Sequence, residues 1–459
     1  MLCGNLGNKS KDSYYKYGDI YTLGPRSVAI SNPEDCRRVL GSTDFVKHPD
    51  YAGLAIEENV MISTLSEEDA HVRHKRVGPM FSHANLAKME HILIDNGVKA
   101  LFNKWDDAIS QATADKPAEI NYAWHLLMMS FDVACSHVYS RQFGMLGSGQ
   151  MQIVKWIAGY RLVSSIGAFL SSVSRVLFEF LLSDAIKNKD DFFKFTRKLT
   201  LERCEKHLSG KNSEKKLDAL ESVLKAPNPA ANFALSTNQV TAEVTAFLVA
   251  NSSSTSETMC WTLHHMLLNP RTYCLAVEQA RSKFTHSHTV TYQECKAHLP
   301  YVEACIYEGM RIHAISGPVL PRVVPRGGIT VQGYYLPQGT TVAVNITGAN
   351  HHRQTWHDPR SFLPERFIDD PMAKKNVFTF SFGARSCPGR NLALRQMLVV
   401  FANILKNYDF ELPKDALFNP GNLDKHGYPQ AMPSVQRIMI GPKYPERDCR
   451  VIIRKAPQE

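Results

Sequence analysis

The stretch FSFGARSCPG, residues 380–389, is the part of the sequence that decides the fold. Its cysteine, Cys387, stands at the start of a helical pattern of apolar residues that includes Leu392, Met397 and Phe401. Free backbone N–H groups and the positive end of the helix dipole stabilise a thiolate at such a position. The neighbouring glycines let the backbone pass close to a flat partner, so the pattern is typical of a thiolate that binds haem iron.

A buried core thiol is the alternative interpretation, and for one cysteine in a chain of this size it holds about nine times in ten. The spacing Phe-x-x-Gly-x-Arg-x-Cys-x-Gly, however, arises by chance in roughly one chain in ten thousand. The stretch resembles the signature of the cytochrome P450 family, the haem-thiolate monooxygenases. The resemblance implies that Cys387 is the metal-binding axial ligand and that Phe380 and Gly389 contact the haem. Arg385 can reach a haem propionate with a charge-assisted hydrogen bond.

A second, independent motif lies upstream. Glu308 and Arg311 are three residues apart on one face of a predicted helix. The sequence PERF, residues 364–367, comes later and is preceded by WHDP, residues 356–359. A solvated surface pair is the usual explanation of an acid and a base at this spacing. The combination resembles the family's arginine motifs, which implies that Glu308, Arg311 and Arg366 form a buried structural network, fully charge-paired because burial is costly.

Further basic residues match positions that the family places on the haem propionates. Arg322, in the sequence LPR, corresponds to the arginine that follows the ExxR helix. His71 and Lys75, in HVRHKR at residues 71–76, correspond to the first and fifth positions of an upstream helix. Lys75 stands where the family more usually has an arginine. Its ammonium group is a point charge, whereas an arginine guanidinium can bind two oxygens at once. A solvated basic helix face is the alternative for these two residues.

The predicted helix at residues 240–268 resembles the distal helix of the family, whose middle normally reads Ala-Gly-x-Asp/Glu-Thr-Thr. This chain has ANSSST at residues 250–255, which places Ser253 at the acid and Ser254 at the alcohol. The resemblance implies catalytic roles for Ser253, Ser254 and Thr255 in hydrogen bonding and proton delivery. Ser254 can donate a hydrogen bond, but Ser253 cannot supply a carboxylate.

Several explanations of this altered helix remain open. Water along the Ser/Thr run, or a polar group on the substrate, could deliver the protons. The enzyme could also be one that does not activate dioxygen in the usual way. A further alternative is that the serines only loosen the helix, because Ser side chains compete for backbone hydrogen bonds.

The resemblance implies a haem-dependent monooxygenase that inserts one oxygen atom from O2 into a lipophilic organic substrate. Electrons would come from NADPH through NADPH–cytochrome P450 reductase or a similar donor. Phe247, Ala250 and Val319 would line the substrate pocket, although core packing gives the same apolar composition. Because Ser253 replaces the usual acid, two alternatives stay open: a peroxide-using or isomerising haem-thiolate enzyme, and a non-catalytic haem protein.

The periodicity predicts a chain that is mainly α with a smaller β portion, an α+β class. Short strands and turns are expected in the first fifty residues, and β-like alternation returns at residues 329–331 and 341–344. The resemblance covers nearly the whole chain. It implies one P450 domain, residues 1–459, with a triangular helix-rich prism around a buried haem and residues 380–389 as its haem-thiolate loop.

The long helix has recognisable ends in the sequence. Ser236 or Thr237 is expected to cap its start, because both side chains can accept from free N–H groups of the first turn. Asn269 and Pro270 are expected to end it. Another helix is expected directly after Cys387.

The composition is that of an ordinary globular protein, with 44% hydrophobic and 21% charged residues. Lys and Arg number 53 and Asp and Glu 44, which gives a net charge of +9. The positive charges are spread along the chain, so no nucleic-acid partner is indicated. Ten cysteines without CxxC pairs predict mostly reduced thiols in a reducing compartment.

The sequence contains no uninterrupted run of the about 18 to 20 apolar residues that a membrane-spanning helix needs. The N-terminus also lacks the apolar core of a secretory signal. The membrane anchor of microsomal family members is therefore expected to be absent. The resemblance is to microsomal, eukaryotic members, fungal ones among them, which implies the cytoplasmic face of the endoplasmic reticulum membrane. A chain without an anchor would be cytoplasmic. The apolar stretch 153–182 indicates a peripheral membrane contact or an ordinary buried helix pair.

Overall fold

The computed structural model describes residues 6–167, 180–208, 218–224, 235–316 and 319–457. Helices dominate and the sheets are small, which confirms the predicted fold class. The longer helices are α1 (Leu6–Tyr17), α2 (Pro33–Gly41), α3 (Glu67–Val77), α6 (Lys99–Ser110), α7 (Tyr122–Tyr139), α9 (Gln152–Gly167), α11 (Ser183–Leu208), α13 (Thr237–Leu268), α14 (Pro270–Lys283), α16 (Pro300–Ile312) and α19 (Arg390–Asn407).

Short helices and strands connect these elements. The short helices are α4 (His83–Lys88), α5 (Glu90–Ile92), α8 (Met145–Ser148), α12 (Ala219–Leu224), α15 (Tyr292–His298), α17 (Ile346–Asn350), α18 (Arg366–Asp369) and α20 (Pro445–Asp448). The strands are β1 (Ile20–Gly24), β2 (Ser27–Ile30), β3 (Glu119–Asn121), β4 (Val319–Val323), β5 (Ile329–Val331), β6 (Tyr334–Leu336), β7 (Thr341–Asn345), β8 (Tyr408–Glu411), β9 (Ser434–Arg437), β10 (Met439–Pro442) and β11 (Arg450–Lys455).

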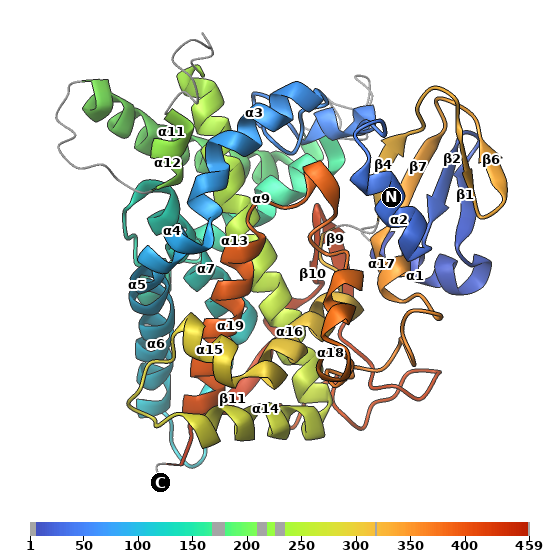
Figure 1. Ribbon diagram of the computed structural model, residues 1–459. Coiled ribbons are helices and arrows are strands. Elements are labelled where there is room, and N and C mark those ends of the chain that lie inside the picture. Colours follow the sequence, from blue (N-terminus) through green and yellow to red (C-terminus); the bar gives the residue numbers. More distant parts are fainter. Residues whose placement is uncertain (1–5, 168–179, 209–217, 225–234, 317–318, 458–459) are drawn as a thin grey trace.

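A four-stranded sheet at one edge of the molecule joins the N-terminal hairpin to the segment after α16, in the order β1-β2-β7-β4 (Figure 1). β1 and β2 form an antiparallel hairpin and are two of the short strands expected in the first fifty residues. β2 pairs with β7 in parallel, and β7 pairs with β4 in antiparallel register. At the end of β7, the Asn345 amide donates to the backbone oxygen of Ser10 and to the hydroxyl of Ser31. These bonds fix α1 to the sheet.

The first fifty residues contain two long helices where only strands and turns were expected. α2 has a local start signal, because the Asn32 side chain accepts from the backbone N–H groups of Glu34 and Asp35. α1 has no comparable apolar pattern, and long-range contacts hold it instead. The backbone N–H of Arg353 donates to the Tyr14 hydroxyl at 2.8 Å, a contact that no local pattern could predict.

α13 runs through the helical part of the molecule and contains 32 residues (Figure 1). Its predicted cap is confirmed, because Ser236 Oγ accepts from the Gln239 N–H and the Gln239 side chain accepts from the Ser236 N–H. The helix ends at Leu268, followed by Asn269 and Pro270 as predicted. Buried residues lie on most of its sides, as in a helix enclosed by protein. α7, α11 and α16 pack against it.

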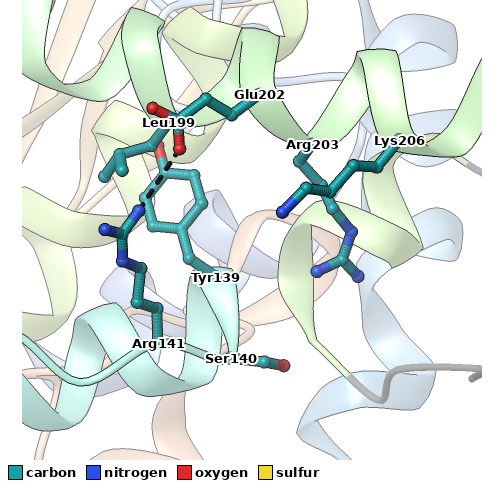
Figure 2. A pocket seen from close by; sticks show the side chains of 7 residues that line it. All are labelled: Tyr139, Ser140, Arg141, Leu199, Glu202, Arg203 and Lys206. Carbon is teal, nitrogen blue, oxygen red and sulfur yellow. Dashed lines mark hydrogen bonds and ion pairs between the residues drawn. The ribbon is translucent and has the colours of Figure 1, made fainter. Parts of the chain in front are cut away.

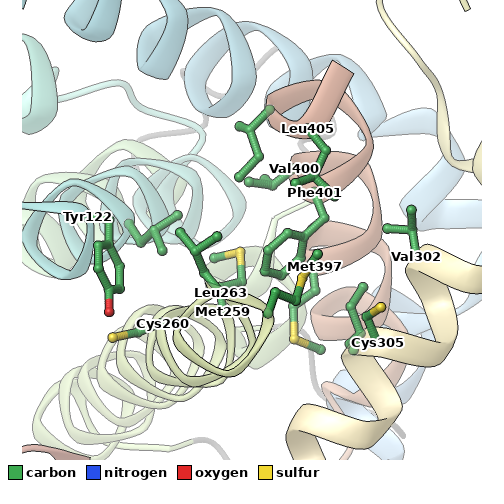
Figure 3. Close-up of a cluster of buried hydrophobic side chains, with 14 of the residues drawn as sticks. Tyr122, Met259, Cys260, Leu263, Val302, Cys305, Met397, Val400, Phe401 and Leu405 are labelled. Carbon is green, nitrogen blue, oxygen red and sulfur yellow. The ribbon is translucent and has the colours of Figure 1, made fainter. Parts of the chain in front are cut away.

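The largest core cluster lies between α7, α13, α16 and α19 (Figure 3). Met259 and Leu263 from α13 join Met397 and Phe401 from α19, and Val302 joins them from α16. Because α19 follows the 380–389 loop directly, this packing fixes where the loop ends relative to α13 and α16.

The hairpin of β9 and β10 lies against α9 and α13. Ile438 at its tip has a φ of +64°, which is costly for a β-branched residue. The indole N–H of Trp261 in α13 donates to the carbonyl of Ile440 at 3.2 Å. The hairpin is therefore held against the C-terminal half of α13.

The apolar stretch at residues 153–182 is only partly described. α9 covers its first part, and residues 168–179 lie outside the described residues. No helix within the described ranges is long and apolar enough to cross a membrane. The described cysteines are all free thiols, in agreement with the sequence analysis.

We expect Phe401→Ala to lower the free energy of unfolding by about 3–5 kcal/mol, because it leaves a cavity in the largest core cluster. Phe401 is 1% exposed. The control is Leu423→Ala, where the side chain is 56% exposed and the cost should stay within about 0.5 kcal/mol. Denaturant unfolding followed by circular dichroism measures both. Equal costs would contradict the assignment of the core.

Candidate functional site

The loop at residues 380–389 closes on itself just before α19. The backbone N–H of Cys387 donates to the carbonyl of Phe380 at 2.9 Å. The N–H groups of Gly389 and Arg390 donate toward the Cys387 sulfur. α19 begins at Arg390, so the sulfur lies at the N-terminal end of an 18-residue helix, where the sequence placed it.

A close approach between this loop and α2 explains its first glycine. Gly383 has a φ of +74°, and a Cβ there would lie 2.4 Å from the carbonyl oxygen of Leu40. Only glycine accommodates both conditions. Phe380 packs against the main core, and the Arg390 guanidinium lies 5.8 Å from the centre of its ring.

Cys387 has an accessible side chain deep in the protein. It is exposed, yet burial is the main cause that raises the pKa of its thiol. The two observations together indicate that the sulfur borders an internal space. The N–H groups of Gly389 and Arg390 and the Arg390 charge lower the same pKa without cancelling the effect of burial. A metal ion would supply the further positive charge that a thiolate needs there.

Three cationic side chains meet near this loop: Lys47, Arg322 in β4 and Arg385 in the loop. Lys47 and Arg322 are partners in an isolated β-bridge, and their cationic groups lie 4.8 and 5.7 Å from the ring centre of Tyr51. Arg385 forms two hydrogen bonds of 2.9 Å with the Glu67 carboxylate. We call Lys47, Arg322 and Arg385 the cation cluster.

The cation cluster carries more positive charge than its neighbours neutralise. Glu67 is the carboxylate that acts on it, so three cations face one anion. Burial, followed by the charges of Arg385 and Arg322, lowers the pKa of Lys47 to about 7. A partner with two carboxylates would balance the cluster, and the two propionates of haem fit this set of donors. Sequence reasoning missed Lys47, because its β-bridge to Arg322 joins distant parts of the chain.

α3 presents His74, rather than Lys75, to the cation cluster. Burial and then the charges of Arg385 and Lys47 lower the pKa of His74. His71 and Lys75 are exposed, and among the described residues no hydrogen bond or ion pair joins either of them to the cluster. The ion pair between Glu67 and Arg385 joins α3 to the cysteine loop, and His74 lies two turns from Glu67 on the same face.

Glu308, Arg311 and Arg366 meet in one buried network. Arg311 donates to both carboxylate oxygens of Glu308, at 2.7 and 2.8 Å. Arg366 Nε donates to Glu308 Oε1 at 3.1 Å. The remaining N–H groups of Arg311 donate to the carbonyls of Asn350, Pro359 and Ser361. All five donors of this guanidinium are therefore used.

The same region holds the start of the cysteine loop. The Asn350 amide donates to the carbonyl of Met310 in α16, and its oxygen accepts from the backbone N–H of Phe378 at 3.0 Å. The Thr379 hydroxyl also donates to the Met310 carbonyl, at 2.8 Å. Because Phe380 follows at once, the Arg311 network sets the position of the loop that bears Cys387.

The serines of α13 bind their own helix. Ser253 Oγ donates to the Val249 carbonyl and Ser254 Oγ to the Ala250 carbonyl, each at 2.5 Å. Hydroxyls that bond back to the preceding turn often bend a helix. Thr255 Oγ1 is buried and has no hydrogen-bond partner among the described residues.

The residues expected to line the substrate pocket differ in burial. Ala250 is exposed although it lies in the middle of α13, and Phe247 and Ser254 are half-buried. One face of α13 therefore borders a space within the protein. The Phe247 ring packs edge-on against Phe81, with 6.4 Å between centroids. Val319, at the start of β4, is also half-buried.

A separate surface pocket of about 390 Å³ lies between the end of α7 and α11 (Figure 2). Its charged lining residues are already paired, because Arg141 meets Glu202 at 3.3 Å and Arg203 meets Asp218 at 3.2 Å. None of the predicted site residues lines it. We assign no catalytic role to this pocket.

Comparison with known proteins identifies the family. A model of the cytochrome P450 family matches residues 4–425. The chain belongs to the cytochrome P450 family. It is similar to "Cytochrome P450 monooxygenase helB1" from Aspergillus fumigatus, with 36% identity over 96% of this chain and 76% of the relative. It is also similar to "Cytochrome P450 monooxygenase helB2" from the same organism, with 34% identity over 96% of this chain and 88% of the relative.

A solved structure supports the fold of this P450. The crystal structure of the cytochrome P450DA heme domain superposes with a TM-score of 0.78 and covers 98% of this chain and 93% of the other. Because the two sequences are only 16% identical, this similarity supports the fold alone. The family implies a haem-thiolate cofactor, and the curated relatives make this protein a P450 monooxygenase. That activity displaces the peroxide-using, isomerising and non-catalytic alternatives.

We expect Glu308→Gln to lower the free energy of unfolding by about 3–5 kcal/mol, because Arg311 and Arg366 would remain buried without their counter-charge. The matched control is Glu411→Gln, which breaks an ion pair with Arg454 whose side chains are both 57% exposed. That change should cost less than about 1 kcal/mol. Denaturant unfolding measures both variants. Similar costs would contradict the structural role of the network.

Proposed function

We propose that Cys387 would bind the haem iron as a thiolate and that the face of α13 with Ala250 and Ser254 would border the space that receives haem and substrate. The observation that carries this proposal is the closed loop in which Cys387 receives N–H donors at the start of α19 and still borders an internal space. Haem held in this way supplies oxidising chemistry that inserts one atom of O2 into a C–H bond of the substrate.

The cation cluster of Lys47, Arg322 and Arg385 binds the haem propionates in this proposal. His74 assists from α3 and replaces Lys75 in that role. Lysine gives a point charge, and the two arginines give forked donors that match carboxylates. Arg385 also keeps its contact with Glu67, so we expect it to position the cluster as well as to neutralise a propionate.

Phe247, Ala250 and Val319 form the apolar wall against which a lipophilic substrate is held. Apolar walls exclude water and orient the substrate by shape. Ser254 lies one turn from Ala250 on the half-exposed face of α13 and can hold a proton at its Oγ. Ser253 and Thr255 are buried beside it, and we assign them to the same hydrogen-bonding run.

Electrons reach the enzyme from NADPH through a flavoprotein such as NADPH–cytochrome P450 reductase. The net charge of +9 supports an acidic partner, and the exposed Arg390 beside Cys387 supports docking on that side. We place the enzyme on the cytoplasmic face of the endoplasmic reticulum membrane. Phe180 and Leu181, 80% and 66% exposed, support a peripheral contact with lipid.

We expect Cys387→Ala to abolish the long-wavelength Soret band of the reduced carbon-monoxide complex, because that band requires thiolate ligation. Cys274→Ala is the matched control, since Cys274 is also an exposed free cysteine and should leave the band unchanged. The difference spectrum of reduced protein with and without carbon monoxide measures both. A band that survives in Cys387→Ala would end the haem-thiolate assignment of this residue.

We expect the pKa of Lys47 to be about 7 in haem-free protein and to rise by about one unit or more when the propionates bind. This pKa lies below the ordinary 10.5 of lysine, so the unfolded chain binds more protons between about pH 7 and 10.5. Stability of the haem-free protein therefore rises with pH through this window. NMR titration of ¹³C-methylated lysines measures the pKa, and Lys47→Arg assigns the signal. A midpoint that haem leaves unchanged would contradict the proposed cluster.

A further inference from the structure

A buried acid lies one helical turn beyond the position where α13 lacks one. Glu257 is four residues after Ser253 and three after Ser254. Side chains at these spacings are neighbours on a helix, with Cβ atoms about 5–6 Å apart. Glu257 is also seven residues after Ala250, so it lies on the face of α13 that borders the internal space, about 10 Å further along the axis.

The carboxylate of Glu257 is enclosed and paired. Arg161 Nη1 in α9 donates to Glu257 Oε1 at 2.7 Å, and the two side chains are 11% and 14% exposed. A Cβ on Gly441 in β10 would lie 2.4 Å from the same oxygen, so glycine there leaves room for the carboxylate. Burial raises the pKa of Glu257 and Arg161 lowers it. Burial is the larger of the two effects, so the net direction of the pKa of Glu257 is upward.

Arg161 ties three elements together at this point. Its Nε and Nη2 donate to the carbonyls of Arg437 and Met439 on either side of the β9–β10 tip, at 3.0 and 3.1 Å. Met439 Sδ in turn lies 3.5 Å from Ser253 Oγ. Hydrogen bonds therefore join the acid, its cation and the hairpin tip, and the Met439 side chain at that tip contacts Ser253 in the serine run of α13.

We propose that Glu257 takes over the proton-relay role of the acid that Ser253 lacks, and that it acts through the hydroxyl of Ser254. This inference rests on the proposed function. In the reaction, O2 takes two electrons from NADPH and two protons, one oxygen atom leaves as water and the other enters the substrate C–H bond. Glu257 passes a proton toward Ser254, whose hydroxyl passes its own proton on, and solvent reprotonates Glu257. Glu257 is a positioning residue, because it acts through Ser254.

The structural alternative is that Glu257 only holds Arg161 and the hairpin. The chain offers a matched control for it in the same helix. Glu243 is also buried in α13 and also pairs with an arginine at 2.7 Å, Arg73 of α3. It lies fourteen residues from Glu257, about 21 Å along the helix. Glu243→Gln removes an equivalent buried charge far from the serine run.

The test uses the haem-loaded full chain with NADPH and a flavoprotein reductase, without added substrate. Under these conditions O2 leaves either as hydrogen peroxide, with two electrons and two protons, or as two water molecules, with four of each. We expect Glu257→Gln to raise the ratio of hydrogen peroxide to water about tenfold or more, because a relay acid contributes at least that factor. Glu243→Gln should keep the wild-type ratio. Peroxide yield and oxygen consumption measure it.

Rescue separates proton delivery from structure. Glu257→Asp keeps the acid at its own position and should stay near wild type, which gives a readout even if Glu257→Gln folds poorly. The C–O stretching band of the reduced carbon-monoxide complex should shift in Glu257→Gln and not in Glu243→Gln.

Each outcome decides between the proposals. An unchanged peroxide ratio in Glu257→Gln, or a ratio raised as much in Glu257→Asp as in Glu257→Gln, overturns the role of Glu257. An equal rise in Glu243→Gln overturns it as well, because the effect would then follow from any lost ion pair in α13. A wild-type protein without the thiolate-type Soret band overturns the proposed function instead.

Discussion

The guanidinium of Arg311 is the interaction on which the haem side of the molecule depends. It is fully enclosed, and every one of its donors meets Glu308 or a carbonyl of the segment at residues 350–361. An unpaired buried charge costs about 3–5 kcal/mol, so this segment has no other position of similar free energy. The segment then holds the backbone of Phe378 through Asn350, and the cysteine loop begins two residues later.

Two sets of buried cations in this protein differ in how they are balanced. In the Arg311 network, protein groups accept every hydrogen bond of the guanidinium, so the network stabilises the fold without a ligand. Among the described residues, Glu67 is the carboxylate that pairs with the cation cluster of Lys47, Arg322 and Arg385, and burial together with the charges of Arg385 and Arg322 lowers the pKa of Lys47. A folded chain that retains such an imbalance gains stability from an anionic partner, since any ligand that binds only the folded state stabilises it. Under the proposed function, haem bound at this cluster would therefore stabilise the folded chain.

Features fixed by local spacing could be predicted from the sequence, and features fixed by long-range contacts could not. The cap at Ser236 and the loop before α19 follow from residues close together in the chain. The fold class follows from periodicity. His74, rather than Lys75, faces the cation cluster because each residue turns the chain by about 100° around α3, and the ion pair between Glu67 and Arg385 that helps to orient this helix joins distant parts of the chain. Lys47 and α1 were missed for the same reason, because their partners lie hundreds of residues away.

The position of the acid in α13 follows from where its cation can reach. Ser253 is fully buried beside Met439, so a carboxylate there would need a cation to offset its desolvation. Arg161 contacts Met439 as well, and its Nε and Nη2 donate to the two carbonyls of the hairpin tip. With the guanidinium held in that orientation, its remaining N–H group meets the helix one turn later, at Glu257. The contacts of Arg161 with the hairpin thus determine which turn of α13 carries the acid. A serine at position 253 leaves room for Met439 and places no unpaired charge in the protein interior.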